Sequence, residues 1–161
     1  MVSGEALHIV AAGRAHGPNE LTSKALDGPV LGLAEGWSEK HLGIVSRRVL
    51  NAHSSATDLA VTSLRQALKD ADWTGDALDA IVCGTTFPDY IHPAAAAYVA
   101  KEIQPAAIAF DINAACASFI FALATATGLM RTLPEVNKVA VCTAEHPTAW
   151  VDYSDSHSSV F

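Results

Sequence analysis

Cys116 is the residue of this sequence whose type and setting are best suited to chemistry. It lies in the segment Asp111-Ile112-Asn113-Ala114-Ala115-Cys116-Ala117-Ser118-Phe119, where an apolar run ends and an apolar helix is expected to begin. The dipole and the unpaired N–H groups at the start of a helix favour the thiolate, which is the nucleophilic form of a cysteine. Most free cysteines are small buried hydrophobic residues, so a packing role stays open beside the catalytic one.

The remaining candidates for chemistry are weaker. Cys83 and Cys142 lie inside apolar runs, which favours a packing role for both. Asp152, Asp155 and His157 lie close together in a polar segment, but such groups are usually solvated, and we expect no metal site. No GxGxxG motif follows the first apolar run, and GxxxxGK(S/T) and HExxH are absent. A nucleotide-binding α/β domain is therefore disfavoured.

The elements that must position these residues follow from the apolar pattern. Continuous apolar runs are typical of strands covered on both faces, and periodic apolar stripes indicate helices. The sequence predicts strands over residues 7–12, 80–83, 106–110 and 139–142, and helices over residues 54–71, 93–103 and 116–131. Ser55 or Thr57 would cap the first helix. The alternation predicts an α/β layered fold. We also expect a long irregular segment over residues 13–55, of a kind that is usually functional, and an edge or hairpin strand over residues 158–161.

The third helix is uncharged, because no charged residue occurs between Ile112 and Met130. Residues 117–130 would cover roughly 21 Å at about 1.5 Å per residue, which is short of a hydrocarbon core of about 30 Å. A helix that is apolar on all sides but too short to span a bilayer is usually the buried central helix of a layered protein. We adopt that interpretation.

Composition narrows the classes of partner. The chain has 161 residues, is 50% hydrophobic and carries a formal net charge of −7, which suits one globular domain. An acidic chain is a poor binder of nucleic acid or of anionic membrane. The N-terminus shows no basic segment leading into an apolar stretch, so we expect a cytoplasmic protein.

Several segments, taken together, resemble one known family. Asp111-x-x-Ala114-Ala115-Cys116-Ala117-x-Phe119 is similar to the active-site segment of the ketoacyl-acyl-carrier-protein synthase III family, which has a thiolase-like fold. The other matches occur in the family's order along nearly the whole chain. They are Trp37 followed by Gly43-Ile44-x-x-Arg47, Thr85-Thr86-Phe87-Pro88-Asp89-Tyr90 with Pro93, and Glu145 after the last predicted strand.

The sequence departs from the family pattern at three places. Ser118 stands where family members usually have glycine, and His41 stands where they often have arginine. Ser154-Asp155 replaces an Asp-Arg pair. The serine points to an altered acyl pocket or helix entry, and the histidine weakens the assignment of a phosphate contact.

The resemblance implies a fold and a set of roles. The fold would be a thiolase-like α/β/α/β/α arrangement in which residues 1–161 form the N-terminal half-domain. The C-terminal half, with the catalytic His and Asn, would be absent from this chain, and the completed protein would be a homodimer. Cys116 would attack an acyl thioester, and its N–H would contribute to an oxyanion hole. Trp37 would stack on the adenine of coenzyme A, with Arg47 and His41 near its phosphates.

The resemblance also implies partners. Coenzyme A thioesters would be substrates rather than tightly bound cofactors. The basic cluster of Lys40, His41, Arg47 and Arg48 could also receive an acidic acyl carrier protein. A solvated basic loop with Trp37 packed on the core is the alternative.

The leading functional hypothesis is acyl transfer through a Cys116 acyl-enzyme from an acyl-CoA or acyl-carrier-protein thioester. In one version the enzyme condenses the acyl group with a decarboxylating malonyl unit, in polyketide or other secondary metabolism. In another it transfers an acyl or malonyl group to a hydroxyl and forms an ester. A third possibility, from a different class, is a non-catalytic partner subunit.

Overall fold

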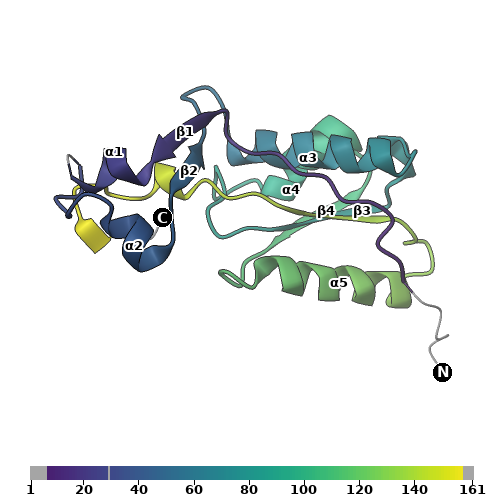
Figure 1. Ribbon diagram of the computed structural model, residues 1–161. Coiled ribbons are helices and arrows are strands. Elements are labelled where there is room, and N and C mark those ends of the chain that lie inside the picture. The colour runs from purple at the N-terminus through teal and green to yellow at the C-terminus, as the bar shows by residue number, and fades with distance from the viewer. Residues whose placement is uncertain (1–6, 29, 158–161) are drawn as a thin grey trace. The chain divides into compact units, whose positions relative to one another are not determined.

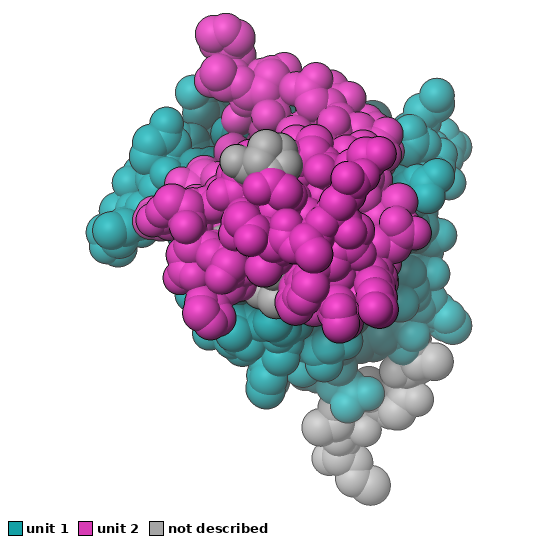
Figure 2. All heavy atoms as spheres, turned by 60° about the vertical axis from the view of Figure 1, so that its left-hand side comes forward, with its two compact units in different colours: residues 1–15, 55–145 teal, residues 16–54, 146–161 magenta. Residues whose placement is uncertain are grey.

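The computed structural model describes residues 7–28 and 30–157. The chain forms two compact units (Figure 2). Unit 1 comprises residues 1–15 and 55–145, and unit 2 comprises residues 16–54 and 146–161. The predicted edge or hairpin strand over residues 158–161 lies outside the described residues.

A three-stranded parallel sheet forms the centre of unit 1. Its strand order is β4 (Ile108–Ile112), β3 (Ala80–Gly84), β5 (Val139–Thr143), so β3 has a neighbour on both sides. Every residue of β3 is buried, which explains why its sequence is a continuous apolar run. The prediction of these three strands is confirmed, although β4 begins two residues later than its apolar run suggests.

Helices cover both faces of this sheet, as Figure 1 shows. The helices α3 (Ala56–Asp70) and α4 (Ala95–Ile103) lie on one face, and α5 (Ser118–Thr132) lies on the other. Side chains of α3 and α4 form one buried apolar cluster with Ile81 and Cys83 of β3. Unit 1 is therefore an α/β/α arrangement, and the predicted α/β fold is confirmed.

The start of α3 shows how its sequence defines a helix. The Ser55 hydroxyl accepts a hydrogen bond from the Asp58 N–H (3.0 Å), and the Asp58 carboxylate accepts one from the Ser55 N–H (2.8 Å). This reciprocal capping box satisfies two N–H groups that an isolated helix leaves unpaired. Val61, Leu64 and Leu68 then form the buried stripe. The prediction that Ser55 or Thr57 caps this helix is confirmed for Ser55.

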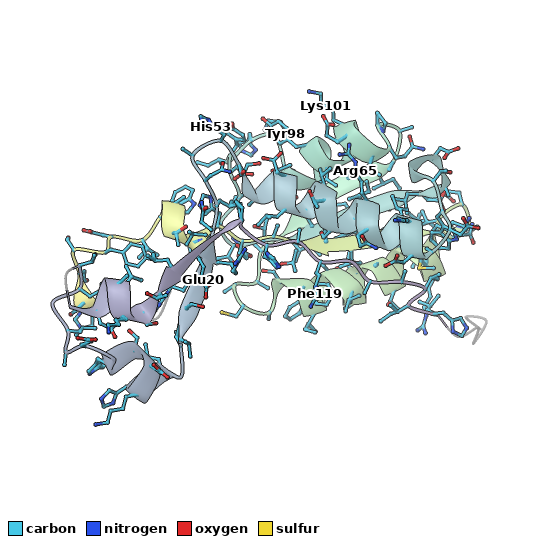
Figure 3. All side chains as sticks on the ribbon, turned by 45° about the horizontal axis from the view of Figure 1, so that its top comes forward. Glu20, His53, Arg65, Tyr98, Lys101 and Phe119 are labelled. Carbon is cyan, nitrogen blue, oxygen red and sulfur yellow. The ribbon has the colours of Figure 1, made fainter. Side chains whose placement is uncertain are left out.

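Helix α5 differs from its prediction in two respects. It begins at Ser118 rather than at Cys116, and its buried residues are Ser118, Ala122 and Ala126. Phe119 is 40% exposed and Ile120 is 64% exposed, so the interpretation of α5 as buried on all sides is wrong for this chain. Only its small-residue face packs on the sheet, because the described residues supply no layer beyond it. Figure 3 shows Phe119 on the opposite side of unit 1 from Arg65 and Lys101.

Helix α5 has 15 residues, close to the length expected from the sequence, and the apolar stretch is longer only when the turn before α5 is included. The 18-residue stretch Ala115–Thr132 is long and apolar enough to cross a membrane by length and composition alone. Core helices of soluble proteins meet the same criterion, so this finding is weak support for a span. The small-residue face of α5 packs on the sheet of unit 1, which favours a core helix over a membrane span.

The predicted strand over residues 7–12 is wrong. The segment runs without strand pairing, and the side chains of Ile9 and Val10 are 82% and 55% exposed. An apolar run becomes a strand only when a neighbouring strand pairs with it, and the described strands of unit 1 do not. The segment instead follows α3 (Figure 1). A Cβ on Gly13 would lie 2.0 Å from the Ser63 carbonyl oxygen, so glycine permits this close approach.

Unit 2 contains short elements where an irregular segment was predicted. The strands β1 (Asn19–Thr22) and β2 (Ser46–Val49) pair antiparallel, and two helices, α1 (Ser23–Asp27) and α2 (Trp37–Leu42), lie between them in sequence. Elements of four to six residues are too short to show a periodic pattern, which is why sequence analysis missed them. Gly36 and Gly43 flank α2 with φ of 76° and 71°, a conformation that favours glycine.

Candidate active site

Cys116 lies in a tight turn that joins β4 to α5, as the sequence predicts. It is an exposed free thiol, one residue before the N-cap of the helix. The Ala117 N–H donates to the Ala114 carbonyl (3.1 Å), and the Ser118 N–H donates to the Ala115 carbonyl (2.9 Å). The side chain of Cys116 is accessible, so the structure does not show the packing role that the sequence left open.

The backbone just before Cys116 adopts an uncommon conformation. Ala115 has φ of 50°, in the left-handed region that residues with a Cβ seldom occupy. The side chain of Asn113 accepts a hydrogen bond from the Ala115 N–H (3.2 Å). Backbone strain of this kind persists only where surrounding contacts enforce it, and it is often found at functional sites.

Gly84, at the end of β3, determines how closely α5 approaches the sheet. A Cβ on Gly84 would lie 2.7 Å from the backbone carbonyl carbon and oxygen of Ser118 and 2.9 Å from the Phe119 nitrogen. Glycine therefore allows the first turn of α5, and with it the Cys116 turn, to sit against the end of β3. Sequence analysis did not identify Gly84. A glycine at the end of an apolar run can mark a place where another backbone segment approaches closely, and this signal could have revealed it.

Three carboxylates of the family-like segments hold the loops at this edge of the sheet. Asp111 accepts from the N–H groups of Ala95 and Ala96 (2.7 and 2.8 Å), so it caps α4, which has no side-chain cap of its own. Glu145 accepts from the N–H groups of Thr86 and Phe87 (2.8 and 2.9 Å).

Asp89 supplies the third of these anchors, at the start of α3. It accepts from the N–H groups of Ala56 and Thr57 (2.9 and 2.8 Å) and from the Thr57 hydroxyl (2.6 Å). The loop that follows β3 is thus held to α3 through Asp89 and to the end of β5 through Glu145. These acidic groups form a framework for the site rather than its reacting groups.

The other two cysteines are buried in the sheet, which confirms their predicted packing role. Cys83 and Cys142 are opposite each other on neighbouring strands and are 3% and 5% exposed. A hydrogen bond with the Cys142 thiol, together with burial, raises the pKa of Cys83 far above its usual value. Cys83 is therefore held in its unreactive thiol form.

In unit 2, the structure brings two of the predicted coenzyme-binding residues together. Trp37 and His41 lie one turn apart on α2, and their rings are stacked with centroids 4.8 Å apart and planes at 29°. The His41 side chain is exposed and Trp37 is partly buried. One face of the indole is thus occupied by the imidazole of His41.

Arg47 lies on β2 and is directed into unit 2. Its Nη1 donates to the Ser23 hydroxyl (2.9 Å), and its positive charge acts on the carboxylate of Asp27. Sequence analysis predicted Arg47 as a phosphate contact, and it could not show that Arg47 also belongs to a side-chain network with Ser23 and Asp27.

Asp27 is the centre of that network and was not identified from the sequence. The carboxylate is fully buried and accepts from the Ser38 N–H (3.0 Å) and from the Ser38 hydroxyl. Burial by itself raises the pKa of Asp27, but the two Ser38 donors, the Arg47 charge and the Gly36 N–H together lower it below its ordinary value. Because Ser38 lies in the first turn of α2, Asp27 fixes the start of the helix that carries Trp37 and His41.

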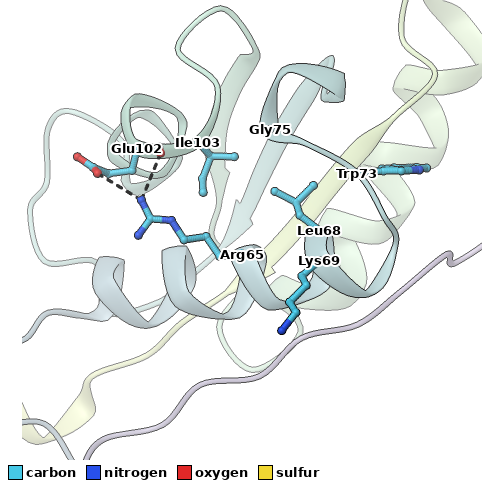
Figure 4. Close-up of a pocket in the computed structure, with 7 residues that line it drawn as sticks. All are labelled: Arg65, Leu68, Lys69, Trp73, Gly75, Glu102 and Ile103. Atoms are coloured by element: carbon cyan, nitrogen blue, oxygen red, sulfur yellow. Dashed lines mark hydrogen bonds and ion pairs between the residues drawn. The ribbon is translucent and has the colours of Figure 1, made fainter.

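A separate hollow on unit 1 lies between α3 and α4 (Figure 4). It is lined by Arg65, Leu68, Lys69, Trp73, Gly75, Glu102 and Ile103. The Arg65 guanidinium lies 3.7 Å from the Glu102 carboxylate, so its charge is already paired. Trp73 and Gly75 precede β3, whereas Cys116 follows the parallel strand β4, so the hollow lies at the other end of the sheet from Cys116.

Comparison with known proteins identifies the family. Residues 110–161, which include Cys116 and Glu145, match the family model described as 3-oxoacyl-[acyl-carrier-protein (ACP)] synthase III. The beta-ketoacyl-[acyl-carrier-protein] synthase III of Prochlorococcus marinus (strain MIT 9313) is 31% identical over 157 residues, which cover 98% of this chain and 46% of that protein. The corresponding enzyme of Synechococcus sp. (strain RCC307) is 35% identical over 127 residues, 79% of this chain and 38% of that one. The chain belongs to the ketoacyl-acyl-carrier-protein synthase III family.

Solved structures of synthase III proteins have the same fold. The 3-oxoacyl-[acyl-carrier-protein] synthase III of Aquifex aeolicus superposes with a TM-score of 0.86 and 28% identity, over 94% of this chain and 48% of that one. A priming beta-ketosynthase from the R1128 polyketide biosynthetic pathway superposes with a TM-score of 0.84 and 26% identity, over 91% of this chain and 44% of that one. The thiolase-like fold is thereby confirmed. The chain spans about half the length of the synthase III proteins it matches.

Within this family, Ser118 and His41 now have observed positions. Ser118 is buried at the first residue of α5, with its hydroxyl directed back to the Cys116 turn. His41 is exposed on α2, and its imidazole stacks on Trp37. The guanidinium of the arginine that family members often have at this position is therefore missing here. The expected half-domain organisation over residues 1–161 stays a prediction.

Proposed function

We propose that this chain carries the nucleophile of a ketosynthase III-type acyltransferase. The observation that carries the proposal is the exposed Cys116 thiol in a turn at the start of α5, next to the strained Ala115, at the edge where β3 and β4 end. The sulfur would bond to the acyl carbon of a coenzyme A or acyl-carrier-protein thioester. The bond from that carbon to the departing sulfur would break, and the departing thiolate would take up a proton.

The start of α5 offers stabilisation for this step. Negative charge develops on the acyl oxygen in the tetrahedral intermediate, and N–H groups at a helix start stabilise such charge. We assign this role to the Cys116 N–H. The oxyanion hole needs no titratable side chain from this chain, and none of the three carboxylates at this edge is directed to the reacting atoms, since each accepts backbone N–H groups.

The second step would use residues beyond this chain. In the condensing version, a malonyl unit loses CO₂, and the resulting carbanion attacks the Cys116 thioester, which forms a carbon–carbon bond and frees the thiol. The family's His and Asn would stabilise the carbanion. The departures from the family pattern at Ser118 and His41 favour a place in polyketide or other secondary metabolism. The ester-forming version remains the alternative.

We further propose that α2 contributes to coenzyme A recognition. Trp37 would present its indole to the adenine, and His41 and Arg47 would lie near the phosphates, as the family resemblance implies. Alternatively, the thioester donor is an acyl carrier protein that binds the basic cluster of Lys40, His41, Arg47 and Arg48. A homodimer completed by a C-terminal half and a cytoplasmic location also stay predictions.

The Trp37 assignment can be tested with one variant and two substrates. Stacking of a base on an aromatic ring is worth about 1–3 kcal/mol, so Trp37→Ala should raise the KM for acetyl-CoA about tenfold. The KM for acetyl-pantetheine, which lacks the adenine, should not change and serves as the matched control. Equal increases for both substrates would contradict an adenine contact.

The acyl-enzyme itself can be tested by intact mass after separate incubation with acetyl-CoA and malonyl-CoA, with Cys116→Ala as the control. An acetyl adduct, with malonyl-CoA consumed only afterwards, supports condensation. A Cys116-dependent malonyl adduct that keeps its carboxylate supports ester formation. No adduct from any thioester in the folded protein would favour the non-catalytic partner, which the exposed Cys116 otherwise disfavours.

A further inference from the structure

We propose that Ser118 is a positioning residue for the nucleophile: its hydroxyl holds the Ala114 N–H and the Ala115 carbonyl, which flank the strained Ala115, and thereby aims the thiol. The inference rests on the proposed role of Cys116 in acyl transfer. It concerns a residue that stands where the family usually has glycine.

The Ser118 hydroxyl bonds to both residues that precede Cys116. It accepts a hydrogen bond from the Ala114 N–H (2.9 Å) and donates one to the Ala115 carbonyl (2.6 Å). The two bonds involve consecutive residues, so the hydroxyl of this helix residue links both of them to the start of α5. Ser118 is 2% exposed, and water therefore does not compete for these bonds.

These bonds act on the strained residue of the turn. Ala115 has φ of 50°, and a residue with a Cβ leaves this region readily unless its neighbours are held. A change of φ at Ala115 would rotate the peptide group that leads into Cys116. The Ser118 hydroxyl holds the Ala115 carbonyl and the Ala114 N–H, one on each side of the strained dihedral angle, and so opposes that rotation.

The position of Ser118 is itself fixed. Its backbone lies against Gly84, where a Cβ would come within 2.7 Å, so the first turn of α5 is seated on the end of β3. Serine near a helix start often caps the helix, yet α5 has no side-chain cap and its N-cap residue is Ala117. The Ser118 hydroxyl instead forms its hydrogen bonds with the turn that precedes the helix.

The test compares two rates in the full-length protein. One is acylation of Cys116 by acetyl-CoA, followed by intact mass, and the other is alkylation of Cys116 by iodoacetamide. A misplacement of about 1 Å in a reacting group can cost on the order of 100-fold, so Ser118→Ala should lower the acylation rate constant about tenfold or more, with little change in the concentration of half-saturation. Alkylation should also slow. Ser118→Thr keeps the hydroxyl but adds a buried methyl group, so it should retain more of both rates than Ser118→Ala does.

A second substitution separates positioning from packing. Glycine adopts positive φ without strain, so Ala115→Gly introduced into Ser118→Ala should restore a substantial part of the lost rate. If Ser118 only packs the start of α5, this second change will restore nothing. Ser63→Ala is the matched control, because the Ser63 hydroxyl donates to the Ala60 carbonyl within α3 and should affect neither rate.

The outcomes distinguish this inference from the proposed function. Equal rates for the native protein and Ser118→Ala, or no recovery in the double variant, would overturn the role of Ser118. If acetyl-CoA and other thioesters fail to acylate any form, the proposed function fails, and the iodoacetamide rates still decide whether Ser118 positions the thiol.

Discussion

Replacing Gly84 with alanine should dislodge the nucleophile turn without changing any residue in it. The added Cβ would lie 2.7 Å from the carbonyl carbon and oxygen of Ser118, and the neighbouring atoms are backbone, so no flexible side chain can move aside. The start of α5 must retreat from β3 by roughly 0.7 Å to reach an ordinary contact of 3.4 Å. Cys116 would move with it.

The cost of this overpacking is about 1–3 kcal/mol in the free energy of unfolding, as for other added methyl groups at tightly packed positions. Urea unfolding followed by circular dichroism measures it, and the alkylation rate of Cys116 by iodoacetamide reports on the turn. Both quantities should fall for Gly84→Ala.

Gly128→Ala makes the same chemical change further along α5 and serves as the control. A Cβ there meets no atom within 4 Å among the described residues. Since alanine is a better helix former than glycine, this variant should gain about 0.5–1 kcal/mol and keep the native alkylation rate. If Gly84→Ala is as stable and as reactive as Gly128→Ala, the close seating of α5 on β3 is refuted.

Three further changes test other parts of the structure. The pKa of Asp27 is lowered on folding, so this carboxylate stabilises the protein above its unfolded value of about 3.8, and the stabilisation is lost as the pH falls through the lower folded value. Asp27→Asn should therefore be less stable at pH 7 and should lose less stability on acidification, as thermal melts at several pH values would reveal; parallel acid profiles for the two proteins would contradict this. Asp111→Ala removes the acceptors at the start of α4 and should cost about 1–2 kcal/mol in urea unfolding, whereas an unchanged midpoint would show that this cap is not needed. Because Cys83 is buried and its pKa is raised, iodoacetamide should label the native protein once, at Cys116, and label all three cysteines only after unfolding; a second label on the native protein would refute the burial.

The sheet and α3 could be predicted because their signals are local. The buried strand β3 must be apolar along its whole length, and α3 shows both a 3.6-residue stripe and the Ser55 cap. The apolar pattern runs through the turn and therefore predicts a start of α5 at Cys116, two residues too early. The left-handed conformation of Ala115, at the beginning of the turn that delays the helix to Ser118, leaves no trace in composition.

The features that sequence analysis missed depend on distant partners. Residues 7–12 have the composition of a strand, but pairing requires a neighbour that no local pattern reveals. Gly84 is important because the start of α5 lies against it. Asp27 is important because it accepts a hydrogen bond from Ser38, a residue eleven positions away in the sequence. The position of Cys116 at a helix start, by contrast, could be predicted because that signal is local.

The most direct test of the central claim locates the acyl group on the protein. The protein would be incubated with acetyl-CoA, digested under conditions that preserve thioesters, and analysed by peptide mass spectrometry. The account predicts one acetyl group on the peptide that contains Cys116, and none on that peptide in Cys116→Ala. An acetyl group on the peptide of Cys83 or Cys142, or acylation that persists in Cys116→Ala, would contradict the account.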